Sequence, residues 1–308
     1  MSSLIVNEFT YDIVITSYNS EGTIRRAIKS AINQELPPQN IIVIDDCSQD
    51  GSAAIINELK SEFSIIKLIT NSKNMGQSYS RNLGVKLSKS KYVMFLDDDD
   101  LSLPERSSQH AIMFRAGAQI SFVSSNIIYG NGYSVICKND NINVRKINSS
   151  EMLLYLVTGK SKSIFNRFFI PTSTCAVNVA CFNNLGGFDI LLRRLEDVDF
   201  AIRAAQENTF FSWTSDLGVN RFSSYGNDKG GDIDSKYEIM ILNKFKDLIS
   251  GQLFKQIIIY SNLRQIYFGK HYFQGLFYIS TNPQSLIIIL KKVTVLFLRI
   301  AHDMRRAN

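Results

Sequence analysis

Short apolar runs alternate with segments of helical periodicity over the first hundred residues of the chain. Four runs have the length and composition of buried strands; they are Tyr11–Thr16, Ile41–Ile44, Ile65–Thr70 and Tyr92–Leu96. Between them, apolar residues recur at the three- and four-residue spacing of a helix, as Ile24, Ala27, Ile28 and Ala31 do. This alternation predicts an α/β fold with a mostly parallel central sheet flanked by helices.

The fourth predicted strand runs directly into four aspartates, Asp97–Asp100. Carboxylates at the end of a core strand repel one another, and burying them is costly unless a positive charge offsets theirs. A divalent cation with oxygen ligands, carrying a phosphate-bearing substrate, would supply that charge. The alternative is a solvated acidic loop before the helix predicted to begin at Pro104. An isolated acidic run leaves both interpretations open.

The earlier strand ends favour the first interpretation. Polar residues follow the first two strands, at Ser17–Asn19 and Asp45–Ser52. In open α/β sheets, ligands bind at the carboxyl ends of the strands, so these segments and the acidic run are expected to line one crevice. Ribose and base groups need acceptors there, and a pyrophosphate needs a metal and an arginine, for which Arg81 is the candidate. Neither GxxxxGK[ST] nor GxGxxG occurs, which argues against a P-loop NTPase and a dinucleotide-binding dehydrogenase.

Four segments in succession resemble the nucleotide-binding half of family 2 glycosyltransferases, which are inverting enzymes with the GT-A fold. They are IVITSYN (13–19), VIDDCSQDGS (43–52), NMGQSYSRNLG (74–84) and FLDDDD (95–100). The resemblance implies a nucleotide-sugar donor, with uridine favoured, and a Mn²⁺ or Mg²⁺ ion that bridges its diphosphate.

The resemblance also assigns roles to single residues. The donor-binding positions are Thr16 and Tyr18 at the base, Asp45 and Asp46 at the nucleoside, Arg81 near the nucleotide, and Asp97 and Asp98. Asp97 and Asp99 are the expected metal ligands. Because four aspartates are consecutive, the register stays open by one, and Asp98 or Asp100 could share the metal. Asn74 and Asn82 have an alternative explanation as caps of turns or helices.

The second half of the predicted domain contains further predicted strands and a second acidic motif. Gln119–Tyr129 and Tyr133–Lys138 are expected to form a hairpin through Gly130–Gly132, and Ile170–Val179 a further strand. Acidic residues in the first turn of the helix opening at Glu196 are ordinarily explained by the helix dipole. The order GGFD (186–189) and EDVDF (196–200) nevertheless resembles the acceptor-side element of the family.

That resemblance makes Asp197 the general base and Glu196 a contact to phosphate or acceptor. Many relatives have a histidine further on, as a metal or phosphate contact. The stretch VNRFSSYGND (219–228) has none, so Arg221 is the expected phosphate contact instead.

The chain is predicted to divide at residue 234. Residues 1–100 would form the nucleotide-binding half and 101–234 the acceptor-side half of a GT-A domain, and 235–308 a helical, basic and apolar extension. Residues 236–308 carry a charge of +8 and the remainder −2. The apolar run from Leu286 is shorter than the roughly 20 residues that span a bilayer and contains Lys291 and Lys292. Residues 286–306 are therefore expected to lie on an anionic membrane surface or, alternatively, to pack on the protein itself or on a second subunit of a homo-oligomer.

Composition limits the cellular location and the binding partners that we expect for the protein. The four cysteines have no CxxC spacing, and the N-terminus shows no signal-peptide pattern, so we expect a cytoplasmic protein, peripheral on the inner face of the cell membrane. The three histidines do not cluster, which argues against zinc. The slightly acidic body argues against nucleic-acid binding.

The sequence therefore predicts a metal-dependent inverting glycosyltransferase. Its acceptor would be a saccharide or lipid-linked saccharide, in the synthesis of bacterial surface polysaccharide such as O-antigen or capsule. A nucleotidyltransferase of related fold and a catalytically silent saccharide-binding or membrane-scaffold protein are the alternatives. The sequence leaves the donor sugar, the linkage and the oligomeric state open.

Overall fold

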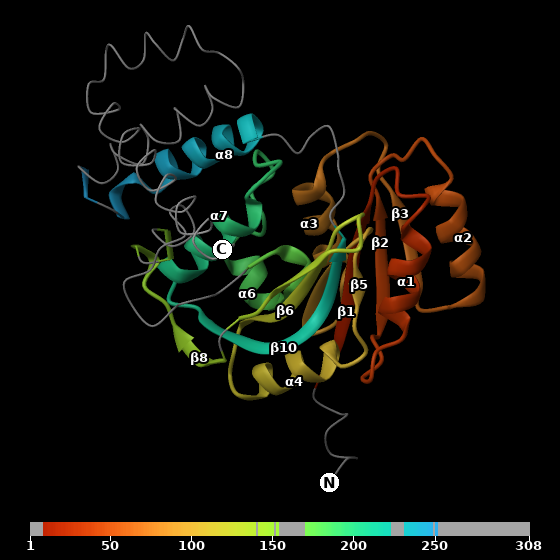
Figure 1. Ribbon diagram of the computed structural model, residues 1–308, viewed down its shortest axis with the longest axis horizontal. Helices are drawn as coiled ribbons and strands as arrows, with labels where there is room; N and C mark the ends of the chain where they lie inside the picture. The colour runs from red at the N-terminus through yellow and green to blue at the C-terminus, as the bar shows by residue number, and fades with distance from the viewer. Residues whose placement is uncertain are drawn as a thin grey trace, which may run out of the picture. The chain divides into compact units, whose positions relative to one another are not determined.

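A mixed parallel and antiparallel β-sheet lies at the centre of the N-terminal unit of the chain (Figure 1). The structure is a computed structural model that describes residues 9–139, 141–150, 152–153, 170–222, 231–248 and 250–251. Among these residues the sheet has ten strands, in the order β3-β2-β1-β4-β9-β6-β10-β5, with β7 beside β6 and β8 beside β10. The chain divides into two units, Met1–Ser224 and Tyr225–Asn308, and the sheet belongs to the first.

The first four strands are parallel, as predicted. They are β1 (Tyr11–Ser17), β2 (Asn40–Asp45), β3 (Ile66–Thr70) and β4 (Tyr92–Asp97). The helices α1 (Ile24–Ile32), α2 (Ser52–Glu62) and α3 (Gln77–Leu87) connect them. In register, Thr16 lies beside Asp97 and Ser17 beside Asp45, so β1, β2 and β4 end at the same level.

Helices cover both faces of these strands. Side chains of β1 alternate between the two faces. Ile13 and Ile15 belong to one buried cluster with Ile28 of α1. On the other face, a Cβ added to Gly84 of α3 would lie 2.4 Å from Val14 Cγ1, so glycine is required for α3 to pack this closely against β1.

The second half of the sheet is mixed. It contains β5 (Leu101–Ser102), β6 (Ile120–Ile128), β7 (Ser134–Cys137), β8 (Ile142–Lys146), β9 (Cys175–Asn178) and β10 (Phe210–Phe222). β9 is antiparallel to both β4 and β6, and β10 is parallel to β6. The predicted hairpin is confirmed, because β6 and β7 pair antiparallel.

Two predictions here need correction. The strand expected over Ile170–Val179 is shorter, because η1 (Thr172–Thr174) forms a 3₁₀ turn after Pro171 and β9 begins only at Cys175. The helix expected from Pro104 is α4 (Arg106–Arg115), which begins two residues later. The sequence did not predict β8 or β10. β10 has register shifts between Trp213 and Val219 that break its alternation.

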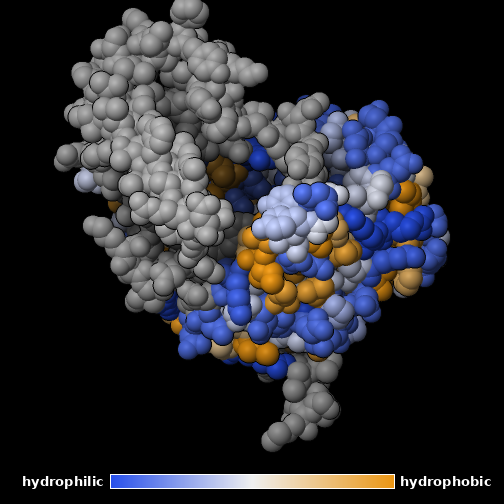
Figure 2. All heavy atoms as spheres, viewed as in Figure 1, coloured by the Kyte–Doolittle hydropathy of each residue, from blue (hydrophilic) through white to orange (hydrophobic). Residues whose placement is uncertain are grey.

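Two further helices complete the described part of this unit, α6 (Val179–Asn184) and α7 (Glu196–Gln206). On the face shown in Figure 2, hydrophilic residues cover most of the described surface, and hydrophobic residues form smaller patches. In the second unit the structure describes α8 (Gly231–Lys244) and η2 (Lys246–Leu248). The predicted membrane-surface segment 286–306 lies outside the described residues. None of the described helices has the length and hydropathy that a membrane span requires.

Candidate active site

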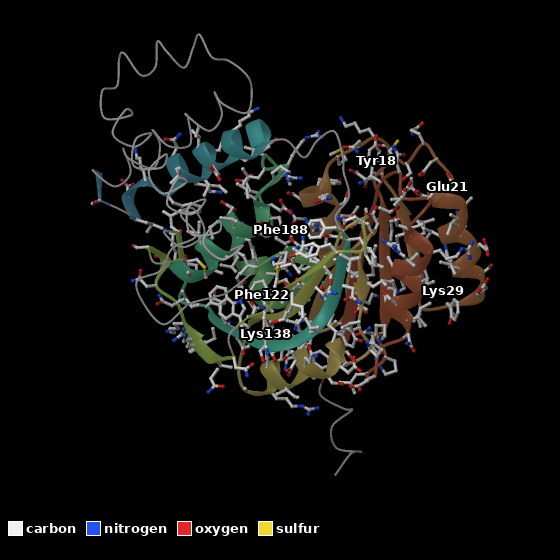
Figure 3. The ribbon with its side chains drawn as sticks, viewed as in Figure 1. Tyr18, Glu21, Lys29, Phe122, Lys138 and Phe188 are labelled. Carbon is white, nitrogen blue, oxygen red and sulfur yellow. The ribbon has the colours of Figure 1, made fainter. Side chains whose placement is uncertain are left out.

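The loops that follow β1 and β4 are joined by a direct hydrogen bond. The Tyr18 backbone N–H donates to Asp98 Oδ2 at 3.1 Å, and Thr16 lies beside Asp97 in the sheet. The Tyr18 side chain is 48% exposed, and it projects beyond the end of β1 near Glu21 (Figure 3). The structure thus brings these predicted donor-site residues together at one edge of the sheet, with an exposed aromatic ring beside them.

Asp45 and Asp46 follow β2, and their surroundings differ. Both oxygens of Asp46 serve the loop before α3, since they accept hydrogen bonds from Asn71 Nδ2 at 2.7 Å and from the backbone N–H groups of residues 75 and 76 at 2.9 and 2.8 Å. Asp45 Oδ2 accepts only a long bond, 3.4 Å, from the Ser48 N–H. Its Oδ1 is buried and has no partner among the described residues. Of the two carboxylates, Asp45 is therefore the one with an unused acceptor.

Two aspartates of the acidic run accept hydrogen bonds from the backbone of other segments. Asp98 accepts the Tyr18 N–H, and Asp100 Oδ1 accepts the Phe222 N–H from β10 at 3.0 Å. Asp100 Oδ2 also lies 3.7 Å from Arg221 Nε. Burial raises the pKa of Asp98 and of Asp100 to about 7, and repulsion from the neighbouring aspartates adds to the rise. These partners favour structural roles for Asp98 and Asp100.

Asp97 and Asp99 make contacts of a different kind. Asp97 has a side-chain exposure of 25%, and Arg81 Nη2 bonds only its Oδ1, at 2.7 Å. Asp99 is partly exposed, and its backbone carbonyl accepts a bond from Arg26 Nη2 at 2.6 Å. Arg81 thus leaves one oxygen of Asp97 outside its hydrogen bond, and the register of the metal ligands stays a prediction from the sequence.

Arg81 joins the two constellations that the sequence suggested separately. Its Nη2 contacts Asp97, and its Nη1 contacts Glu196 Oε1 at 2.5 Å, at the start of α7. Burial lowers the pKa of the Arg81 guanidinium, but the charges of Asp97 and Glu196 outweigh burial and raise the pKa above its ordinary value. The arginine thus remains charged and bridges the end of β4 to the start of α7.

Asp197 lies next to this bridge, in the first turn of α7. Burial raises its pKa to about 7, and the charge of Glu196 adds to the rise. The Val198 N–H, which donates to Asp197 Oδ1 at 2.8 Å, and the charges of Arg81 and Arg221 act in the opposite direction. A carboxylate with this pKa can accept a proton near neutral pH, as a general base must.

The backbone immediately before Glu196 is strained. Leu195 has φ of 62° and ψ of 22°, which is the left-handed region that branched residues rarely adopt. Such conformations persist only where the surrounding structure enforces them, and they often occur at functional sites.

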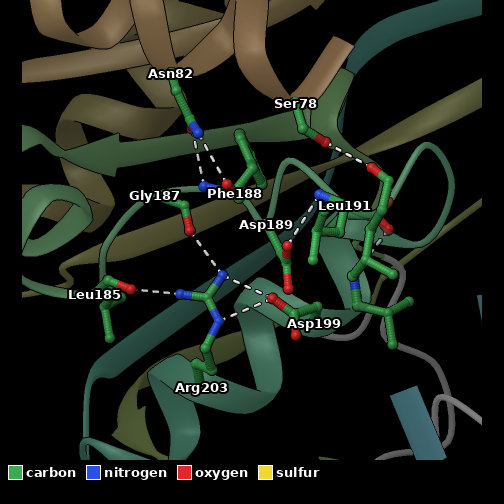
Figure 4. A network of polar contacts seen from close by, with 12 residues as sticks. Ser78, Asn82, Leu185, Gly187, Phe188, Asp189, Leu191, Asp199 and Arg203 are labelled. Carbon is green, nitrogen blue, oxygen red and sulfur yellow. Dashed lines mark hydrogen bonds and ion pairs between the residues drawn. The ribbon is translucent and has the colours of Figure 1, made fainter. Parts of the chain in front are cut away.

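Part of that enforcement comes from α3. The Asn82 side chain makes two reciprocal bonds with the backbone of Phe188: its Nδ2 donates to the carbonyl at 2.8 Å, and its Oδ1 accepts the N–H at 2.9 Å (Figure 4). One turn earlier, Ser78 Oγ donates to the Leu192 carbonyl at 2.8 Å. Gly187 has φ of 70°, and a Cβ there would lie 2.8 Å from Asn82 Oδ1, so this position requires glycine. Asn82 therefore holds the loop before α7, and this contact explains the residue without a capping role.

The other part comes from α7 itself. Arg203 bonds Asp199 one turn earlier, through Nε at 2.8 Å, and also the carbonyls of Leu185 and Gly187, the latter at 2.7 Å (Figure 4). The Phe188 ring packs 5.4 Å from that of Phe95 in β4, measured between centroids. The loop is thereby attached to α3, α7 and β4. Arg203 was not predicted from the sequence, although its spacing of four residues from Asp199 in a helix indicates an ion pair.

The acidic edge suits a divalent metal chemically. Carboxylate oxygens are the ligands that Mg²⁺ and Mn²⁺ prefer, and such ions are often bound by one or two carboxylates together with substrate phosphates. Asp97 and Asp99 fit that donor set. Among the described residues, no group of three or more His, Cys, Asp or Glu side chains is arranged as a complete set of metal ligands.

Comparisons with known proteins agree with this architecture. The family described as "Glycosyl transferase family 2" matches residues 12–175, which is more than half of the 308 residues. An uncharacterized glycosyltransferase of Haemophilus influenzae is 27% identical over 201 residues, which are 64% of this chain and 63% of that protein. The chain thus spans less than two thirds of that relative.

A second relative is matched over more of its length. The Escherichia coli UDP-Glc:alpha-D-GlcNAc-diphosphoundecaprenol beta-1,3-glucosyltransferase WfgD is 27% identical over 247 residues, 79% of this chain and 84% of WfgD.

A solved structure matches with a TM-score of 0.62 and 18% sequence identity, over 84% of this chain and 73% of that one. It is S. aureus TarS 1-349 in complex with UDP-GlcNAc. The likeness confirms the predicted GT-A fold class. The matched family, the shared fold and the conjunction of the two motif constellations lead to one conclusion: the chain is a member of glycosyl transferase family 2.

Proposed function

We propose that the protein is a metal-dependent, inverting glycosyltransferase that moves a sugar from a UDP-sugar to a saccharide acceptor on a lipid carrier. The observation that carries the proposal is the Arg81 bridge. It ties Asp97, at the donor-side edge of the sheet, to Glu196, whose neighbour Asp197 has a pKa near 7. The proposed base and Asp97, which would hold the metal ion for the diphosphate, would therefore belong to one site.

The donor would lie over the ends of β1, β2 and β4. The buried Asp45 Oδ1, which has no partner among the described residues, would accept a hydrogen bond from the nucleoside, and the exposed ring of Tyr18 offers a flat surface for the base. The names of the relatives support uridine, since WfgD uses UDP-Glc and TarS was crystallised with UDP-GlcNAc. Asp97 and Asp99 would hold the Mn²⁺ or Mg²⁺ ion, and a bound ion of this kind supplies charge stabilisation to a departing diphosphate.

The chemistry would be a single in-line displacement. Asp197 would remove the proton from the acceptor hydroxyl while the oxygen of that hydroxyl attacks the anomeric carbon. A bond forms between these atoms as the bond from the anomeric carbon to the diphosphate oxygen breaks, so the nucleoside diphosphate leaves and the anomeric configuration inverts. Arg221, which lowers the pKa of Asp197 and lies near Asp100, is placed to add positive charge at this edge.

The acceptor follows from analogy with WfgD, whose printed name specifies a diphosphoundecaprenol-linked sugar. A lipid-linked saccharide in polysaccharide synthesis is the corresponding proposal for this chain. Attachment to the membrane surface and homo-oligomerisation remain predictions from the sequence of residues 235–308.

A donor screen tests the proposal without knowledge of the acceptor. Purified protein is titrated calorimetrically with UDP-, dTDP- and GDP-sugars in the presence of Mn²⁺, and slow hydrolysis is followed by release of nucleoside diphosphate. We expect binding and diphosphate release with a UDP-sugar. Release of pyrophosphate from a nucleoside triphosphate and a sugar phosphate would instead indicate a nucleotidyltransferase. Binding without turnover, even with lipid-linked acceptors, would indicate a silent binding protein.

A further inference from the structure

Arg106, the first residue of α4, is a buried charge that the proposed chemistry does not use. Its side chain is fully buried, and its Nε and Nη1 have no hydrogen-bond partner among the described residues. No described carboxylate forms an ion pair with it. Burial lowers the pKa of the guanidinium to about 10, so it is still charged at neutral pH. An unpaired buried charge is expensive, and an apolar side chain of similar volume would often be more stable in its place.

The contacts of Arg106 lie where the pairing of two strands ends. β4 and β9 pair at Tyr92 with Asn178, Val93 with Val177 and Met94 with Ala176. The ladder then stops, although β4 continues to Asp97 along its other neighbour, β1. Arg106 Nη2 donates to the Phe95 carbonyl at 2.7 Å and to the Cys175 carbonyl at 3.3 Å.

These two carbonyls belong to the pair that would have continued the ladder. The Val179 N–H donates to the Lys91 carbonyl at 3.0 Å, and hydrogen-bonded pairs alternate in an antiparallel ladder. The next hydrogen-bonded pairs are therefore Val93 with Val177 and, by extension, Phe95 with Cys175. The Cys175 N–H turns instead to the Thr172 carbonyl, in η1. The guanidinium thus takes the place of the Cys175 N–H at the Phe95 carbonyl.

We propose that Arg106 is a positioning residue: it links the end of β4 to the end of β9 in place of one ladder bond and so fixes the direction in which the acidic run Asp97–Asp100 leaves the sheet. Its charge, close enough to Asp97 and Asp100 to interact with both, also offsets the repulsion within that run. The role of the acidic run in binding a metal and a diphosphate rests on the proposed function. The link that Arg106 makes between the two strand ends does not depend on that function.

The test compares Arg106→Met, which keeps volume but removes the charge and donors, with Arg106→Lys, which keeps the charge and a donor group. Arg115→Met, at the exposed end of the same helix, is the control. Two quantities are measured: the affinity for UDP in the presence of Mn²⁺, and the hydrogen exchange of the Asp100 amide, which donates to the Asp97 carbonyl at 3.2 Å.

We expect Arg106→Met to keep or raise the melting temperature, to weaken UDP binding by about 10- to 100-fold, and to speed exchange of the Asp100 amide. Arg106→Lys should recover most of both losses, and Arg115→Met should match the wild type. A purely structural role predicts instead that stability and affinity fall together. If Arg106→Met does not fold, Arg106→Gln, which is neutral and too short to reach both carbonyls, replaces it with the same expectations.

Wild-type affinity and exchange in the neutral variant would overturn the proposal, as would an Arg106→Lys variant no better than Arg106→Met. If the wild-type protein binds no UDP, the proposed function fails. The exchange measurement still decides the role of Arg106 in that case.

Discussion

Replacing Arg81 by methionine would break the bridge between the two halves of the site. The change leaves Glu196 and Asp97 without their shared cation, at side-chain exposures of 9% and 25%. Removing one partner of a buried ion pair costs about 3–5 kcal/mol. Because water screens Asp97 in part, we expect the lower end, about 3 kcal/mol. For a domain of this size, that loss corresponds to a decrease of about 6–12 °C in melting temperature.

The assay is thermal unfolding followed by circular dichroism, with a matched exposed pair as control. Arg25 makes a similar two-bond contact with Glu58, but the side chains are 39% and 55% exposed. Arg25→Met should therefore change the melting temperature much less than Arg81→Met, since exposed pairs contribute little. Adding Glu196→Gln to Arg81→Met should restore part of the loss, because it removes one of the uncompensated charges. Equal effects of the two arginine variants would refute the reasoning.

Three further predictions address the base, the loop and the metal. Asp197→Asn should leave UDP-sugar affinity unchanged and lower kcat by about 10²- to 10⁴-fold. Wild-type kcat should rise as pH increases through about 7, where the carboxyl ionises. The same pKa shift sets the sign of the effect on stability. The fold disfavours the ionised form, so Asp197→Asn should be more stable than wild type at pH 8, and the difference should vanish below the ordinary pKa of 3.8, where the carboxyl is protonated in both the folded and the unfolded state. Asn82→Ala removes both bonds to the Phe188 backbone and should lower kcat more than it raises KM for the donor, measured by steady-state kinetics; an unchanged kcat would show that the loop does not need this attachment. EDTA should abolish transfer and Mn²⁺ or Mg²⁺ restore it, whereas full activity without any divalent ion would rule out the assigned role of Asp97 and Asp99.

The sequence predicted those parts of the site that depend on strands and their ends. Tyr11–Thr16 and Tyr92–Leu96 are apolar enough to be recognised as buried strands, and parallel strands in one layer must end at a common edge. The meeting of Thr16 and Asp97 follows from that geometry. The acidic start of α7 was recognised by a different route, its resemblance to the acceptor-side element of the family, because acidic residues in a first helical turn are by themselves explained by the helix dipole.

The sequence could not predict which aspartates of the acidic run bond to the protein backbone. It depends on backbone N–H groups of Tyr18 and Phe222, and any residue type provides such a group. Asn82 and Arg203 act on carbonyls in the same way. The strand that carries Phe222 was itself missed, because its polar middle segment and register shifts hide the two-residue period.

The most direct test of the central claim is a crystal structure of the protein with UDP and Mn²⁺. We predict one Mn²⁺ ion ligated by a carboxylate oxygen of Asp99 or Asp97 and by the diphosphate. Uracil should lie beside Tyr18 and Asp45, and Asp197 should face the β-phosphate side of the same site. A nucleotide bound away from the ends of β1, β2 and β4, or a diphosphate that contacts neither the acidic run nor its metal, would contradict this prediction.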